Sequence, residues 1–242
     1  MMKSVKLAAV AVGFLLATGV AAVADERVDA AQKRIAKAWA RVESVSAKFT
    51  MKQRVDTNEM SITTDGTGTL ELQIKGGKTF SRMEMKTHSM QVVGGQEIKT
   101  DAEIVSVDDA TFLYTLSKQQ GAPPFAMKSK SQPKSWGGDQ AAFDQMKQQF
   151  TLKLLDDATI EGRTCFVIEA TPRNPNGATI AKMVSYFDQH SGMMIKSVSL
   201  NQSGKPTQEM AYTDLKFNKG IAPERFVFEA PDGVTVMDMS GR

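Results

Sequence analysis

Residues that could catalyse a reaction or bind a metal are few in this sequence. The two histidines, His88 and His190, are far apart, and neither has a second ligand residue at the spacing of a metal site. Residues Gly77-Lys78-Thr79 resemble the end of a nucleotide-binding P-loop, but that motif requires glycine where this chain has Leu72. We therefore expect no catalytic residue, no bound metal and no cofactor.

The acid pairs and the single cysteine also favour structural roles. Asp108-Asp109 and Asp156-Asp157 fall at expected turns, where aspartate suits the backbone and its side chain is solvated. Cys165 lies in an apolar run, so we favour a buried small hydrophobic residue, with a reactive thiol or an intermolecular disulfide as the alternative. A binding protein is thus more consistent with these residues than an enzyme.

Methionine is unusually abundant, with 15 in the chain. Its flexible thioether side chain fills irregular gaps in protein cores, and it also lines surfaces that accept varied apolar ligands. Both interpretations stay open. The methionines on or beside expected strands are Met51, Met83, Met85, Met183, Met193, Met194 and Met210.

Residues 1–24 have the pattern of a secretory signal peptide. Two lysines precede an apolar run at 7–17 that is too short to cross a bilayer, and Ala22-Val23-Ala24 is a small-x-small cleavage site. We expect export to the periplasm and a single mature domain, residues 25–242, without a transmembrane segment. The net charge of +3 includes the two signal lysines, so the nearly neutral mature part gives no reason to expect nucleic acid as a partner.

The mature part is expected to begin with a helix and to continue as strands. Apolar residues recur at three- and four-residue spacing from Val28 to Val45, which predicts a helix with one apolar stripe. Residues 69–75 alternate between apolar and polar, which predicts an antiparallel sheet with one face toward water. Glycines at 76–77, 192 and 204 predict turns. The other expected strands are 49–55, 79–87, 89–93, 103–107, 111–116, 150–155, 163–171, 181–188, 193–200, 209–217 and 226–229.

Residues 117–138 interrupt this pattern. They are rich in proline, glycine, serine, glutamine and lysine, which predicts a long loop. Asp139 can cap the helix that follows, which carries Phe143, Met146 and Phe150 on one side. Two interpretations stay open: loop and helix form a mobile lid over a cavity, or they are a connector whose helix covers one end of the core.

Three stretches of the chain resemble those of one known family. The N-terminal helix running into residues 45–53 looks like that family's first helix and strand, and residues 66–70 and 111–114 look like its middle strands. The most specific stretch is 225–236, with a phenylalanine-rich strand and a Pro-x-Gly-Val turn like those that close the family's fold. On these residues the chain resembles the LolA family of periplasmic lipoprotein carriers. The predicted elements and the resemblance together give an α+β, mostly antiparallel fold. It is an incomplete, unclosed β-barrel of about ten or eleven strands, with an N-terminal and a short mid-chain helix covering its concave face.

The resemblance implies a carrier, not an enzyme, that shelters the acyl chains of lipoproteins or lipids and ferries them toward the outer membrane. Its partners would be an acylated lipoprotein or lipid, an inner-membrane release complex and an outer-membrane acceptor, and we expect a monomer. The alternative is an envelope-stress sensor of the same fold, which binds lipoproteins and a membrane regulator. The arginine that latches the lid in the family has no matching residue in Lys75-Gly76-Gly77-Lys78, and Arg82 is the nearest candidate.

The residues expected to form the binding cavity come from the apolar sides of the predicted strands. The expected lining is Phe49, Met51, Leu70, Leu72, Ile74, Met83, Met85, Phe112, Tyr114, Met183 and Phe187, and the expected lid residues are Phe143, Met146 and Phe150.

Overall fold

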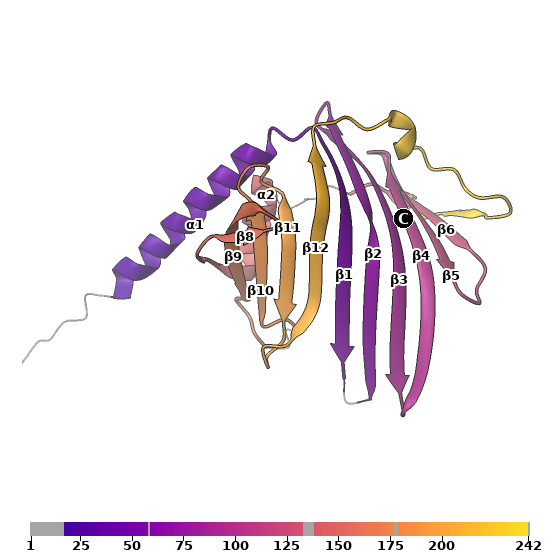
Figure 1. Cartoon of the computed structure of the whole chain (residues 1–242), viewed down its shortest axis with the longest axis horizontal. Coiled ribbons are helices and arrows are strands. Elements are labelled where there is room, and N and C mark those ends of the chain that lie inside the picture. Colours follow the sequence, from indigo (N-terminus) through magenta and orange to yellow (C-terminus); the bar gives the residue numbers. More distant parts are fainter. Residues whose placement is uncertain (1–16, 58, 133–137, 177–178, 242) are drawn as a thin grey trace, which may run out of the picture.

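The chain folds around one large sheet that is not closed. The computed structural model describes residues 17–57, 59–132, 138–176 and 179–241 (Figure 1). The helices are α1 (Ala17–Trp39), α2 (Gln140–Gln149) and the 3-10 helix η1 (Pro223–Phe226). The strands are β1 (Ser44–Asp56), β2 (Met60–Lys75), β3 (Lys78–Val93), β4 (Gln96–Asp108), β5 (Phe112–Gln119), β6 (Phe125–Lys130), β7 (Phe150–Leu154), β8 (Ala158–Ile160), β9 (Arg163–Pro172), β10 (Lys182–Asp188), β11 (Met194–Leu200), β12 (Pro206–Phe217) and β13 (Val236–Asp238).

The topology confirms the expected unclosed, mostly antiparallel barrel. The 13-stranded sheet has the order β13-β6-β5-β4-β3-β2-β1-β12-β11-β10-β9-β7, and β8 pairs with β9. Among the described strands, the parallel pair is β13 with β6. The sheet has more strands than the ten or eleven expected, because β6 and the three-residue strands β8 and β13 were not predicted. The strand expected at 226–229 is wrong, since η1 ends at Phe226 and no strand follows directly.

Pairs of glycines make the tight turns between the longest strands. Gly76 and Gly77 join β2 to β3 with φ of +59° and +72°, as a two-residue hairpin turn with two positive φ angles requires. Gly94 and Gly95 join β3 to β4 in the same way, with φ of +56° and +81°. In Figure 1 these hairpins extend well beyond the strands near the helices.

The first helix ends earlier than its apolar spacing predicted. It stops at Trp39, and Val45 already lies in β1. Both Val42 and Val45 are nonetheless buried in the core, so the apolar spacing continues across the helix end and hides it. Residues 1–16 of the expected signal peptide lie outside the described residues. No helix in the described part of the chain is long and apolar enough to cross a membrane.

The predicted long loop at 117–138 is wrong at residues 117–119 and 125–130, which are strand. β5 continues to Gln119, and β6 forms a hairpin with it. Residues 133–137 lie outside the described residues. The helix after this region is confirmed together with its cap, since Asp139 Oδ1 accepts a hydrogen bond of 2.8 Å from the backbone N–H of Ala142.

One of the two acid pairs differs from the expected solvated turn. Asp156 and Asp157 are exposed. Asp108, however, is only 2% exposed at the end of β4, where its carboxylate accepts hydrogen bonds from the Ala110 N–H and the Ser131 hydroxyl. Cys165 is buried, as the favoured interpretation expected.

Candidate functional site: an apolar sheet face

The register of the sheet assigns each strand residue to one of two faces. Residues directly paired across two strands point to the same side, and their neighbours along each strand point to the other side. Leu70 pairs with Met83 on β3. Met51 and Val55 are four residues apart on β1 and so point to the same side, and Met51 pairs with Met210 on β12. We call the face that carries these residues the inner face, and the opposite one the outer face.

The two α-helices cover the inner face at one end of the sheet. Val28 and Ile35 of α1 and Phe143 of α2 form a buried cluster with Ile168 and Phe187 of the sheet. The ring centroids of Phe143 and Phe187 are 5.3 Å apart. Figure 1 shows α1 beside β8–β11, at the opposite end from β2–β6.

A second buried cluster continues along the inner face next to the end of α1. Trp39 packs there with Val45 and Phe49 of β1 and with Leu70 and Leu72 of β2. Burial decreases away from this cluster. Met83 and Met85 on β3 are half-buried against its edge.

Large apolar side chains also occur on the inner face where the helices do not cover it, among polar ones such as Ser89 and Thr100. Six large apolar side chains are exposed in the described part of the chain, and five of them lie on the inner face by register. Together with the half-buried Ile104 they form two apolar patches on this face. The polar row of Gln53, Thr64, Ser89 and Thr100 separates Val55, Val93 and Ile98 from Ile104, Phe125 and Met237. Such patches in a monomer usually mark an interaction site. The five are Val55 (41% exposed), Val93 (41%), Ile98 (51%), Phe125 (45%) and Met237 (51%).

Methionines are concentrated on this face. Register places Met85 next to Ile104, and Met127 next to Met237. Flexible thioethers adapt to ligands of varied shape, which is the property that an apolar binding surface needs. The methionines on the inner face include Met51, Met60, Met83, Met85, Met127, Met183, Met210 and Met237.

Nine of the eleven residues expected to line the cavity lie on the inner face. Phe49, Leu70, Leu72 and Phe187 are at most 2% exposed and belong to the core. The other five are half-buried, and Met51 and Met85 lie nearer the uncovered part. The half-buried five are Met51, Ile74, Met83, Met85 and Met183.

Phe112 and Tyr114 do not share this face, and their assignment to the same lining is wrong. Their neighbour Leu113 pairs with Asp108, whose partner on β3 is Ser81 on the inner face. Phe112 and Tyr114 therefore point outward. The ring of Tyr114 stacks on Phe228 of the C-terminal segment, with centroids 5.0 Å apart and an interplanar angle of 8°.

The expected lid residues lie over the covered end. Phe143 is fully buried, while Met146 and Phe150 are half-buried and pack against the same cluster. Phe150 is the first residue of β7 and not part of the helix.

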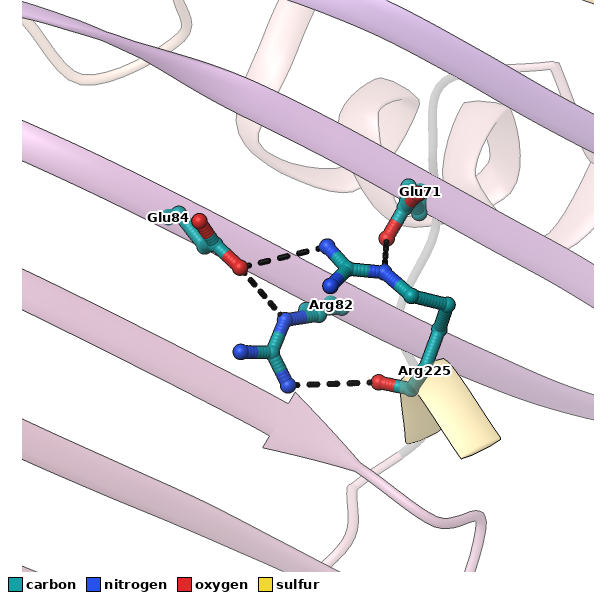
Figure 2. Close-up of polar contacts among 4 residues, drawn as sticks. All are labelled: Glu71, Arg82, Glu84 and Arg225. Atoms are coloured by element: carbon teal, nitrogen blue, oxygen red, sulfur yellow. Dashed lines mark hydrogen bonds and ion pairs between the residues drawn. The ribbon is translucent and has the colours of Figure 1, made fainter. Parts of the chain in front are cut away.

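Two arginines fasten the C-terminal segment to the outer face (Figure 2). Arg225 Nε donates to Glu71 Oε2 at 2.7 Å, and its Nη2 donates to Glu84 Oε1 at 3.2 Å. Arg82 Nε donates to the same Glu84 oxygen at 2.6 Å, and its Nη1 donates to the carbonyl of Arg225 at 3.3 Å. The hydrogen bond from Arg82 lowers the pKa of Glu84, and that with Glu71 raises the pKa of Arg225. Arg82 thus holds the C-terminal segment and not a lid helix.

Farther along β3 and β4 the outer face carries charged pairs. Lys86 pairs with Glu103 at 3.0 Å, and His88 Nδ1 lies 2.7 Å from Asp101 Oδ1. These four side chains line a hollow of about 630 Å³. A hydrocarbon in this hollow would desolvate these four charged or ionisable side chains, so we favour the inner face as the site of an apolar ligand.

Sequence reasoning missed two buried polar residues beneath the helices. Gln32 of α1 and Ser185 of β10 are each 1% exposed. Gln32 falls within the apolar stripe of Val28, Ala31 and Ile35. This position in the sequence could have indicated that its polar side chain is buried. Sequence reasoning also missed Ile98 and Phe125, because strand prediction began at residue 103 in β4 and omitted β6. Ile104 lies within the expected strand 103–107 but was not among the expected lining residues.

Comparison with known proteins supports the fold. A family model described as "uncharacterized protein" matches residues 108–240, which is more than half of the chain. No curated protein matches the sequence significantly. The LolA superfamily protein NE2245 from Nitrosomonas europaea aligns with a TM-score of 0.28, 11% identity, and coverage of 83% of this chain and 97% of that protein, a similarity too low to argue from.

Three of the similar solved structures illustrate the shared fold, with TM-scores above 0.5. MucB aligns at 0.52 with 18% identity over 86% of this chain and 64% of MucB, and the MucA/MucB complex of Pseudomonas aeruginosa at 0.51 with 18% over 84% and 61%. An uncharacterized conserved protein from Thermus thermophilus aligns at 0.53 with 10% identity over 88% and 99%. The chain spans less than two thirds of the MucB chains it matches. The expected resemblance is confirmed at the level of fold, which is of the LolA/RseB type.

Proposed function

We propose that this chain, which belongs to the family matched over residues 108–240 and has a LolA/RseB-type fold, is a periplasmic carrier of acyl chains. The observation that carries the proposal is the set of exposed and half-buried apolar side chains on the inner face beyond the end that α1 and α2 cover. The uncovered part of this face over β1–β6 would receive the hydrocarbon of a lipoprotein or lipid. The role needs neither a catalytic residue nor a cofactor.

The energetics suit such a surface. Exposing an acyl chain to water costs about 0.8 kcal/mol per CH₂, so a chain of about sixteen carbons needs more than about 10 kcal/mol of shelter. Half-buried Met51, Met85 and Ile104 are already adjacent on the inner face, and the helices can extend the cover at its other end. In this proposal residues 1–24 direct export, residues 25–242 act as a single monomeric domain, and membrane partners at both ends supply and receive the cargo.

Two neighbouring residues on β4 test the proposal. Ile104 is half-buried on the inner face, and Val105 is half-buried on the outer face. A charge beneath the bound hydrocarbon would be desolvated, so Ile104→Lys should bind a neutral fluorescent fatty-acid methyl ester at least about tenfold more weakly. Val105→Lys is the matched control and should bind like the unmodified protein. Equal binding by both folded variants would refute the inner face as the site. A charge at the fully buried Leu72 would test folding instead.

A second function is favoured by the openness of the far end of the inner face. Val55, Val93 and Ile98 are exposed near the hairpin ends, where a protein segment can reach them as readily as a lipid. The alternative is a sensor that binds a membrane regulator, and MucB, which shares this fold, has been solved with MucA. Affinity capture from a membrane extract separates the two: acylated lipoproteins support the carrier, and one unacylated regulator segment supports the sensor.

A further inference from the structure

Two buried polar groups interrupt the apolar layer between α1 and the sheet. Gln32 and Ser185 are each 1% exposed. Gln32 Nε2 and Ser185 Oγ are buried without a hydrogen-bond partner among the described residues. Buried polar groups in proteins are almost always hydrogen-bonded, because an unpaired one loses its interactions with water and gains nothing in return. These two atoms are therefore available to bind a molecule that enters this layer.

Both groups face the same layer. Gln32 is buried on the stripe of α1 that carries Val28 and Ile35, and that stripe packs against the sheet. Ser185 pairs directly with Ile168 of β9, which belongs to the same buried cluster.

Ser185 also stands beside another serine without bonding to it. Register places Ser197 of β11 directly opposite Ser185 on the inner face. A hydroxyl that bonded across the strands would be satisfied there, yet Ser185 Oγ remains unpartnered among the described residues. Its hydroxyl is thus available to a group that enters the layer.

We propose that Gln32 and Ser185 bind the carbonyl oxygen of the acyl group whose hydrocarbon tail lies on the inner face. The inference rests on the proposed carrier function and names the chemical group that the site recognises. An amide N–H and a hydroxyl both donate to such an oxygen. Ester, amide and carboxylate ends all present it, whereas a plain hydrocarbon does not. The covered end of the inner face would hold the acyl head, and the open end would hold the tail.

Three pyrene probes with the same tail test this on the full mature chain: dodecylpyrene, pyrenedodecanoic acid and its methyl ester. The protein should bind the methyl ester about tenfold or more tightly than dodecylpyrene. Ser185→Ala and Gln32→Leu should each reduce that preference about tenfold and leave the affinity for dodecylpyrene unchanged. Ser197→Ala is the matched control and should keep the preference. The acid then separates the sources: tight, variant-sensitive binding of the acid supports a free fatty acid, and binding of the ester alone supports an esterified lipid or lipoprotein.

We call Gln32 and Ser185, in their proposed role of binding the acyl carbonyl, the anchor. Thermal unfolding distinguishes this anchor from a pair of residues with only a structural role. Removing an unpartnered buried group should leave the melting temperature unchanged or raise it. Variants that are at least as stable and keep the full preference for the ester would overturn the anchor, since the two groups then bind only a buried water. If the protein binds none of the three probes, the carrier proposal fails as well. If it binds ester and hydrocarbon equally, the carrier stands and the anchor falls. Ser185→Ala removes a single oxygen, so it alone decides the matter if Gln32→Leu does not fold.

Discussion

Two glycines on one strand of the inner face should respond oppositely to the same substitution. A Cβ atom at Gly68 would clash with the Glu84 carbonyl oxygen and lie 2.7 Å from Cζ of the buried Phe49 ring. A Cβ atom at Gly66 would meet Met51 Cε at 3.4 Å and Met85 Sδ at 3.5 Å, which is ordinary van der Waals contact. Gly68→Ala must therefore move backbone and ring, while Gly66→Ala fits.

The magnitudes follow from these contacts. Overpacking a closed site costs about 1–3 kcal/mol, and a compatible glycine-to-alanine change gains about 0.4–1 kcal/mol by restricting the unfolded chain. We expect Gly68→Ala to lower the free energy of unfolding by about 1–3 kcal/mol, and Gly66→Ala to leave it unchanged or raise it by up to about 1 kcal/mol. Urea denaturation followed by circular dichroism measures both. If Gly68→Ala is as stable as Gly66→Ala, the close approach of Phe49 to β2, and with it the packing of the inner face, is refuted.

Three further predictions concern other parts of the molecule. Burial raises the pKa of Cys165 to about 11, so at pH 8 Ellman's reagent should label the thiol only after unfolding, and rapid labelling of the folded protein would contradict this burial. Asp139→Ala removes the cap bond to Ala142 and should cost about 1 kcal/mol of unfolding free energy, measured by urea denaturation; no loss would mean that α2 does not depend on its cap. Because Arg82 lowers the pKa of Glu84, the carboxylate stabilises the fold at neutral pH, and this contribution disappears as the pH falls through the lowered pKa. Glu84→Gln should therefore be less stable at pH 7, with a difference from the unmodified protein that shrinks in acid; a constant difference would argue against the ion pair.

Strand periodicity predicted the inner face well where the alternation was clean and failed where register was needed. In β2 the strict alternation placed Leu70 and Leu72 on the buried side. Phe112 and Tyr114 alternate equally well, but they belong to the other face. A shift of one residue in register reverses the face of every side chain, and only the pairing with β4 fixes it. An apolar strand side that packs on a distant segment, such as Phe228, cannot be told from a core-facing side by sequence alone.

Composition misled the prediction at 117–138. The abundance of proline, glycine, serine, glutamine and lysine there predicted a long loop. Lys128, however, lies in β6 with its Nζ 3.9 Å from the centroid of the Phe112 ring and 3.2 Å from Asp238 Oδ2. The ion pair with Asp238 joins residues more than one hundred positions apart, so no local pattern reveals it. The parallel pairing of β13 with β6 has the same long-range origin. Local signals did suffice for α2, whose cap residue and apolar side are both encoded within a few residues.

The distribution of charge between the two faces argues that the uncovered apolar surface is selected for contact. An antiparallel sheet can leave one face in water, and here the outer face fills that role with ion pairs such as Lys86–Glu103. The uncovered inner face is polar in part, as in the row of Gln53, Thr64, Ser89 and Thr100. Ile98 and Met237 nevertheless remain apolar at 51% exposure, on the same side as the buried core. Exposure of these apolar side chains to water is unfavourable, and the helices that could cover them lie at the other end of the sheet. Binding of an apolar partner would remove these side chains from water.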